Sequence, residues 1–118
     1  MIKSYQAAAD IAAYRFVKFA EGGVVQAAAG TDNIIGVSEE LKNTAGYATD
    51  VYIAGSFAEI EAGGAFSAGE ALTSDADGKA VKATKTDNIG AIAMMDANAA
   101  GDIVQVVVQL QRVITAET

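Results

Sequence analysis

Alternation of apolar and polar residues is clearest near the C-terminal end of the chain. The stretch IVQVVVQLQRV, from Ile103 to Val113, is rich in β-branched residues and sets glutamines opposite valines. Side chains two residues apart lie on one face of a strand, so this stretch predicts a strand with one apolar face. Shorter stretches of strand-forming residues run from Asp50 to Ala54 and from Phe57 to Glu61. The pattern therefore predicts short strands rather than helices.

A repeat organises these stretches. The tetrapeptide Thr-Asp-Asn-Ile occurs at 31–34 and again 55 residues later at 86–89, and Gly46 matches Gly101 at the same spacing. Two copies, placed at about 15–60 and 70–114, are too few for a solenoid. Glycine turns separate the strands, and proline is absent. We predict an all-β fold, a small antiparallel sandwich or barrel built from two pseudo-symmetric halves of about 55 residues.

Glycine, aspartate and asparagine mark the expected turns. The Asp-Gly pair at 77–78 falls between two apolar runs and is typical of a tight hairpin, and Glu21-Gly22-Gly23 stands at the equivalent place in the first copy. Short amide and carboxylate side chains favour turns because they bond their own backbone. The predicted structural turn residues are Gly23, Asp32, Asn33, Asp77, Gly78, Asp87 and Asn88.

The N-terminal segment is ambiguous. Residues 3–20 would form a helix by propensity, yet their second half also reads as a strand. Because the repeat aligns that half with the strand at Ala71-Leu72, we favour a strand from about Ala13 to Phe19. We expect residues 1–12 to form an extended N-terminal arm that folds on contact with a partner, and residues 13–118 to form a single β domain.

Charge and composition narrow the function classes. Fifteen Asp and Glu against eight Lys and Arg give a net charge of −7, which disfavours binding to nucleic acid. The chain has no His, the commonest general base, and no Cys, so neither a disulfide nor thiolate ligands are available. No apolar run reaches the length of a membrane span or signal peptide. We expect no membrane partner.

Candidate chemistry would have to rest on carboxylates, lysine or tyrosine. Asp75-Ala76-Asp77 fails as a calcium loop, since Lys79, Ala80 and Thr86 stand where ligands or glycine are needed. Lys79 at a hairpin tip is placed like the modified lysine of lipoyl and biotinyl carrier domains, but its apolar context is missing. Glu59 and Glu61 share one strand face, which makes that face wet or partner-facing. We predict no catalytic residue, no cofactor, no metal site and no enzyme activity.

A set of turn glycines with apolar neighbours extends from about Ala12 to Val108. It comprises Ile35-Gly36-Val37, Val51-Tyr52-Ile53-Ala54-Gly55, Gly63-Gly64, Ala68 to Asp75, Asp77 to Val81 and Ala100-Gly101-Asp102. In this pattern the chain resembles the small capsid decoration, or cement, proteins of tailed bacteriophages. The resemblance implies a structural protein, often a homotrimer, that binds the outer surface of an expanded head and clamps neighbouring major capsid proteins. It implies no catalytic or cofactor residues.

Family members tend to contact the head through terminal arms, so the resemblance also implies a role for Met1 to Ala13. Deletion of residues 1–11 should then weaken attachment and leave the β domain folded. A basic group near this end suits an acidic partner surface. The candidate contacts to capsid or another subunit are Ile2, Lys3, Tyr5, Gln6, Arg15 and Lys18. We expect the protein on the outer capsid surface of the virion, and in the host cytoplasm before assembly.

The alternative is a surface-display or adhesion β module, such as a head-fibre base or a glycan-binding domain. Glycan sites normally use exposed aromatic platforms, and the chain has no Trp. A cluster of its four tyrosines, Tyr5, Tyr14, Tyr47 and Tyr52, on one exposed face would favour this alternative.

Overall fold

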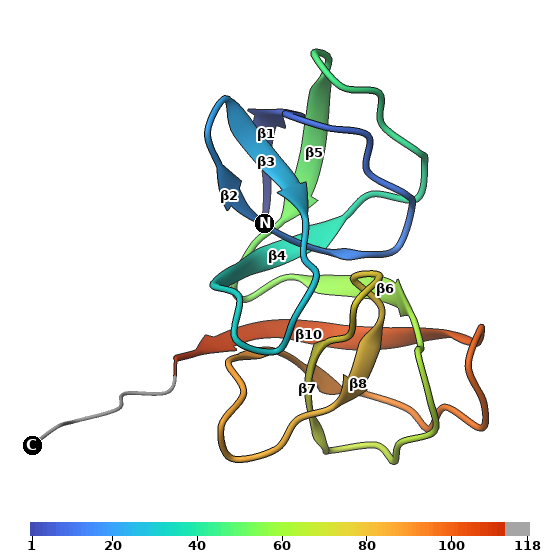
Figure 1. Ribbon diagram of the computed structural model, residues 1–118. Helices are drawn as coiled ribbons and strands as arrows, with labels where there is room; N and C mark the ends of the chain where they lie inside the picture. The colour runs from blue at the N-terminus through green and yellow to red at the C-terminus, as the bar shows by residue number, and fades with distance from the viewer. Residues whose placement is uncertain (113–118) are drawn as a thin grey trace, which may run out of the picture.

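The computed structural model describes residues 1–112, which form two five-stranded sheets and no helix (Figure 1). The first sheet contains β1 (Ile2–Gln6), β2 (Phe16–Ala20), β3 (Gly23–Gln26), β4 (Ile34–Ser38) and β5 (Ala48–Tyr52). The second contains β6 (Phe57–Glu61), β7 (Ala71–Ser74), β8 (Ala80–Lys82), β9 (Ile89–Ala93) and β10 (Ile103–Gln111). All paired strands within each sheet are antiparallel.

The two sheets have the same topology. Their strand orders, β1-β5-β4-β2-β3 and β6-β10-β9-β7-β8, correspond strand for strand. In each sheet an isolated parallel bridge, Ala7 to Val24 or Ala62 to Ala80, links the segments at the two edges. Each sheet therefore curls into a small barrel-like unit, and the two units are stacked (Figure 1). The predicted all-β fold of two pseudo-symmetric halves is confirmed.

The N-terminal segment is a strand of the first sheet, and the extended arm that we expected is not present. β1 pairs with β5 along its whole length, from Ile2 opposite Tyr52 to Gln6 opposite Ala48. Just beyond it, the Ala7 side chain is fully buried. The repeat explains the difference, because β1 stands in the first half where β6 stands in the second. The repeating unit thus begins at residue 2, before the expected start near 15.

Other boundaries differ by a few residues. β2 begins at Phe16, later than the expected Ala13, because Tyr14 has a left-handed backbone with φ of 61° that interrupts an extended strand. Gly69, 55 residues further on, has a φ of 89° at the equivalent place before β7. β5 begins and ends two residues earlier than predicted, whereas β6 matches its prediction. The strand predicted at the C-terminal end is β10, and its last expected residue, Val113, lies outside the described residues.

The two halves share part of their core. One buried cluster belongs to the first half and contains Ala7, Ile11, Val17, Val24, Ile35 and Val51. A larger cluster fills the second half, but it also includes Phe16, Ala27, Ile34 and Val37 from the first. All five residues of β4 are buried, because this strand contributes side chains to both clusters. A Cβ on Gly90 would lie 2.7 Å from Phe16 and 2.9 Å from Ile34, so this glycine makes room for the shared core.

Candidate functional site

The predicted contact residues of β1 are mostly on the surface. Ile2, Lys3 and Gln6 are exposed, and the Ile2 side chain is 53% exposed. Tyr5 is half-buried, with its ring edge-to-face against Phe19 at a centroid distance of 5.4 Å. β1 stands at one end of the strand order of its sheet, and the segment that follows it is bridged to β3. A contact role for these four residues stays a prediction.

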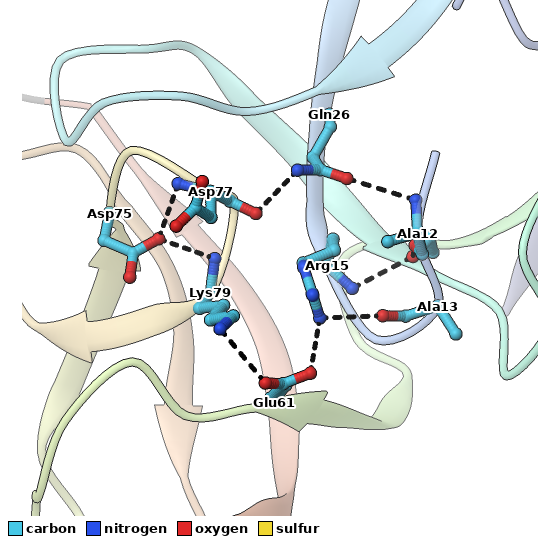
Figure 2. A network of polar contacts seen from close by, with 9 residues as sticks. Ala12, Ala13, Arg15, Gln26, Glu61, Asp75, Asp77 and Lys79 are labelled. Atoms are coloured by element: carbon cyan, nitrogen blue, oxygen red, sulfur yellow. Dashed lines mark hydrogen bonds and ion pairs between the residues drawn. The ribbon is translucent and has the colours of Figure 1, made fainter. Parts of the chain in front are cut away.

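Arg15 and Lys18 have partners inside the protein. The Nη1 atom of Arg15 lies 2.7 Å from a carboxylate oxygen of Glu61, and it also donates to the carbonyl oxygen of Ala13 at 3.0 Å (Figure 2). The Nζ atom of Lys18 lies 3.0 Å from Asp32. Either side chain would have to break an internal ion pair to contact a partner. Their geometry therefore indicates that they stabilise the fold.

Glu61 connects the two halves. Its carboxylate accepts from Arg15 of the first half and lies 3.2 Å from the Nζ atom of Lys79 in the second (Figure 2). Burial alone would raise the pKa of the Glu61 carboxyl, but the hydrogen bonds and charges of these two cations outweigh it and hold the pKa below its ordinary value. Lys79 is therefore engaged in an ion pair, unlike a lysine displayed for modification.

The loop between β7 and β8 packs against the first half. The Asp75 carboxylate accepts hydrogen bonds from the backbone amides of Asp77 and Lys79 at 2.8 and 2.9 Å, so it shapes the loop (Figure 2). Gln26 donates from its side-chain amide to the carbonyl oxygen of Asp77 at 2.7 Å. Gly78 has a φ of 78°, and a Cβ there would lie 2.7 Å from Cγ of Gln26. The loop is longer than the two-residue turn that the Asp-Gly pair predicted, because β7 ends at Ser74 and β8 does not begin until Ala80.

Gly23, the equivalent of Gly78, also allows a close approach. A Cβ on Gly23 would collide with the backbone carbonyl of Gln6 at the end of β1. Its φ of 143° is another conformation that side chains rarely adopt. At both positions a neighbouring segment lies so close to the backbone that a residue larger than glycine would collide with it.

The two Thr-Asp-Asn-Ile turns touch each other. The side-chain amide of Asn88 donates to the carbonyl oxygens of Thr31 and Asp32 at 3.1 and 3.0 Å, and to the Oδ1 atom of Asn33 at 3.2 Å. The backbone amide of Asn88 donates to the carbonyl oxygen of Gly30 at 2.7 Å. The repeated motif is therefore part of the contact between the halves.

The aspartates of the same two turns accept hydrogen bonds from within their own loops and so stabilise the loop conformation. Asp32 accepts hydrogen bonds of 2.8 and 3.1 Å from two backbone amides earlier in its turn. Asp87 accepts from the amide and hydroxyl of Thr84 at 2.9 and 3.0 Å. Burial would raise the pKa of Asp32, but these amides and Lys18 together hold it below its ordinary value.

Sequence reasoning did not find a pocket of about 160 Å³ that lies where the two halves meet. Its lining residues carry negative charge and aromatic rings but no Lys or Arg; they are Ser38, Glu40, Tyr52, Phe57, Ala58, Glu59 and Gln105. Burial raises the pKa of the Tyr52 phenol, and the carboxylates of Glu40, Glu39 and Asp50 raise it further. The pocket, named here the junction pocket, is thus a negatively charged recess with an aromatic wall.

The junction pocket is smaller than the roughly 300–1,000 Å³ of typical ligand sites, and fits a side chain better than a cofactor. Among residues 1–112, no group of three or more His, Cys, Asp or Glu side chains is placed to hold a metal ion. None of the described residues forms a helix long and apolar enough to cross a membrane. Of the four tyrosines, Tyr47 is exposed, while the other three are half-buried. They therefore do not make the exposed platform that would favour glycan binding.

Comparison with known proteins places the chain beside phage proteins. The pattern of the phage cement protein family matches residues 2–110. The fold is similar to the crystal structure of the head fiber gp8.5 N base of bacteriophage phi29, with a TM-score of 0.68 and 21% sequence identity. That similarity covers 92% of this chain and 93% of the phi29 chain. No curated protein matches the chain.

Proposed function

Because the chain belongs to the phage cement protein family, we propose that it binds the outside of a phage head and stabilises contacts between major capsid proteins. The family match carries this proposal, since it includes nearly all of the described chain and both halves of the fold. The working form is a homotrimer on the capsid, formed in the host cytoplasm or on the head, and its role is structural rather than catalytic.

The structure supports a role that depends on surfaces. Several large apolar side chains are exposed, among them Phe57 at 61% and Leu41 at 69%. Exposed apolar groups of this size, when they gather with a polar rim, commonly mark protein contacts. The acidic exterior suits a protein that stays outside a DNA-filled shell.

A head-fibre base is the second candidate function. The fold similarity to the phi29 head fiber N base favours it, because the similarity extends over nearly the full length of both chains. A fibre base would also bind the head, but it would serve as an anchor for a fibre. The two functions therefore differ in what is lost when the protein is absent.

Co-sedimentation with expanded, undecorated heads of the phage that carries this chain tests the proposal, together with the mass of the free protein by light scattering. We expect saturable binding in multiples of three per local threefold position, and decorated heads that release their DNA at a higher temperature than undecorated ones. Failure to bind would overturn the proposal. Binding without any gain in head stability would favour the fibre base.

A further inference from the structure

The outer face of the second sheet carries a row of apolar residues. Phe57 lies opposite Val107, Val107 opposite Ile92, and Ile92 opposite Ala71, so the row crosses four neighbouring strands. Phe57 is 61% exposed and the other three are half-buried. Cross-strand neighbours share a face, so these side chains form a continuous apolar strip, named here the outer row.

The first sheet shows what an equivalent row does when it is covered. There Tyr52 lies opposite Val37, and Val37 lies opposite Phe16. Val37 and Phe16 are fully buried because the second half packs on them, and both belong to the larger core cluster. The two halves thus do not bury equivalent surfaces, and none of residues 1–112 covers the outer row of the second half.

Negative charge borders the outer row on one side. The next cross-strand pair on the same face as Phe57 and Val107 is Glu59 and Gln105, and both line the junction pocket with Glu40. The Glu40 carboxylate lies 3.5 Å from the hydroxyl of Tyr52, and neither it nor Glu59 has an ion pair among the described residues. Phe57 belongs to both features, so the apolar row leads directly into an acidic recess.

We propose that the outer row and the junction pocket together form the surface that docks on the head, and that the occupant is a basic segment of the head protein. Its Arg or Lys side chain enters the junction pocket between Glu40 and Glu59 and lies against the ring of Phe57, while apolar neighbours cover the outer row. The proposal rests on the proposed function and names the chemistry of its partner.

Charge decides between this occupant and a second copy of the chain. A cation beside two carboxylates and over an aromatic ring gains charge-assisted hydrogen bonds and a cation–π contact. A second copy meeting the same surface would bring the acidic rims of two chains, each with a net charge of −7, towards each other. A basic segment is therefore the better match.

Binding of three variants to undecorated heads tests the proposal. Glu40→Gln with Glu59→Gln removes the two pocket charges, and Phe57→Ala removes the ring. Glu21→Gln with Asp77→Asn, at two exposed positions in turns elsewhere, makes the same change in charge and serves as the control. We expect each of the first two variants to bind heads at least about tenfold more weakly, with unchanged thermal melts, and the control to bind like the wild type. Added salt should weaken the wild type more than the double glutamine variant.

Wild-type binding by both pocket variants would overturn the proposal and leave the cement function standing. Loss of binding by the control to the same extent would also overturn it, since net charge rather than the pocket would then decide. If Phe57→Ala instead lowers the mass of the free oligomer and leaves head binding intact, the occupant is a second copy. Failure of the wild type itself to bind heads would remove the proposed function, and this inference with it.

Discussion

Equivalent residues in the two halves do different work. At the same place in β4 and β9, Ile35 fills the core of the first half, whereas Gly90 leaves room for Phe16 and Ile34. Gly23 and Gly78 are both turn glycines, but Gly23 faces β1 of its own sheet and Gly78 faces Gln26 of the other half. Single residues thus convert a repeated sequence into two halves that fit one another.

Gly78 is the residue at which backbone conformation and close packing coincide. We expect Gly78→Val to destabilise the protein by about 1–3 kcal/mol, because its φ of 78° strains any side chain and the new Cβ meets Gln26. Gly69→Ala should cost about 1 kcal/mol or less, since its φ of 89° is unfavourable but the added Cβ would meet nothing within 4 Å. Gly64→Ala, with neither problem, is the neutral control. Thermal melts that do not follow this order would contradict the assignment of the loop.

The lowered pKa of Glu61 should make the free energy of unfolding depend on pH in the acid range. The pKa of its carboxyl lies below the ordinary 4.5 in the folded protein, so the unfolded chain binds the proton more readily. Its contribution is then complete above about pH 4.5 and is lost as the pH falls through the lower folded pKa. Glu61→Gln should lower the free energy of unfolding at neutral pH by about 1–3 kcal/mol, because Arg15 and Lys79 lose their anion.

Denaturant unfolding as a function of pH measures both effects. The free energy of unfolding should fall less steeply on acidification in the Glu61→Gln variant than in the wild type. Asp32 and Glu70 also have lowered pKa values, and they remain in both proteins. Identical slopes for the two proteins would show that Glu61 does not contribute.

Strand positions followed from the repeat better than from local pattern. Alternation identified β10, and the spacing of 55 residues is kept by the starts of β1, β2, β4 and β5 relative to their counterparts. β1 was missed because IKSYQ has no clear apolar face, although its counterpart β6 was predicted. The face that carries Glu59 was expected to be wet or partner-facing, but the junction pocket itself was not predicted. Its residues come from separate strands and loops, which meet only when the halves pack.

The strand β1 is therefore expected to be needed for folding. Deletion of residues 1–6 would expose the edge of β5 and uncover the Tyr5 side of the first core. We expect a clear drop in melting temperature, in contrast to the arm hypothesis, which predicts a folded domain with weaker attachment. The matched control replaces Ile2 and Lys3 with serine, which changes exposed side chains and keeps the strand pairing. A truncated protein that melts at the same temperature as the wild type would support the arm hypothesis instead.

The whole molecule is held together by a core that belongs unequally to its halves. The first half has a buried cluster of its own, while the cluster of the second half depends on four residues supplied by the first. The Asn88 contacts and the ion pair between Glu61 and Arg15 also cross the same boundary. A molecule built this way resists separation of its halves.

Separated halves test this dependence. Residues 57–112 expressed alone should lack stable structure by circular dichroism and NMR, because their core would lose Phe16, Ala27, Ile34 and Val37. Addition of residues 1–56 should restore the native spectrum. As a control, a protease site inserted at the exposed Gly55 should be cut in the full chain without dissociation, since an added Cβ there would have no neighbour within 4 Å. If residues 57–112 fold alone with native stability, the halves are independent modules, and the shared core is not what holds them together.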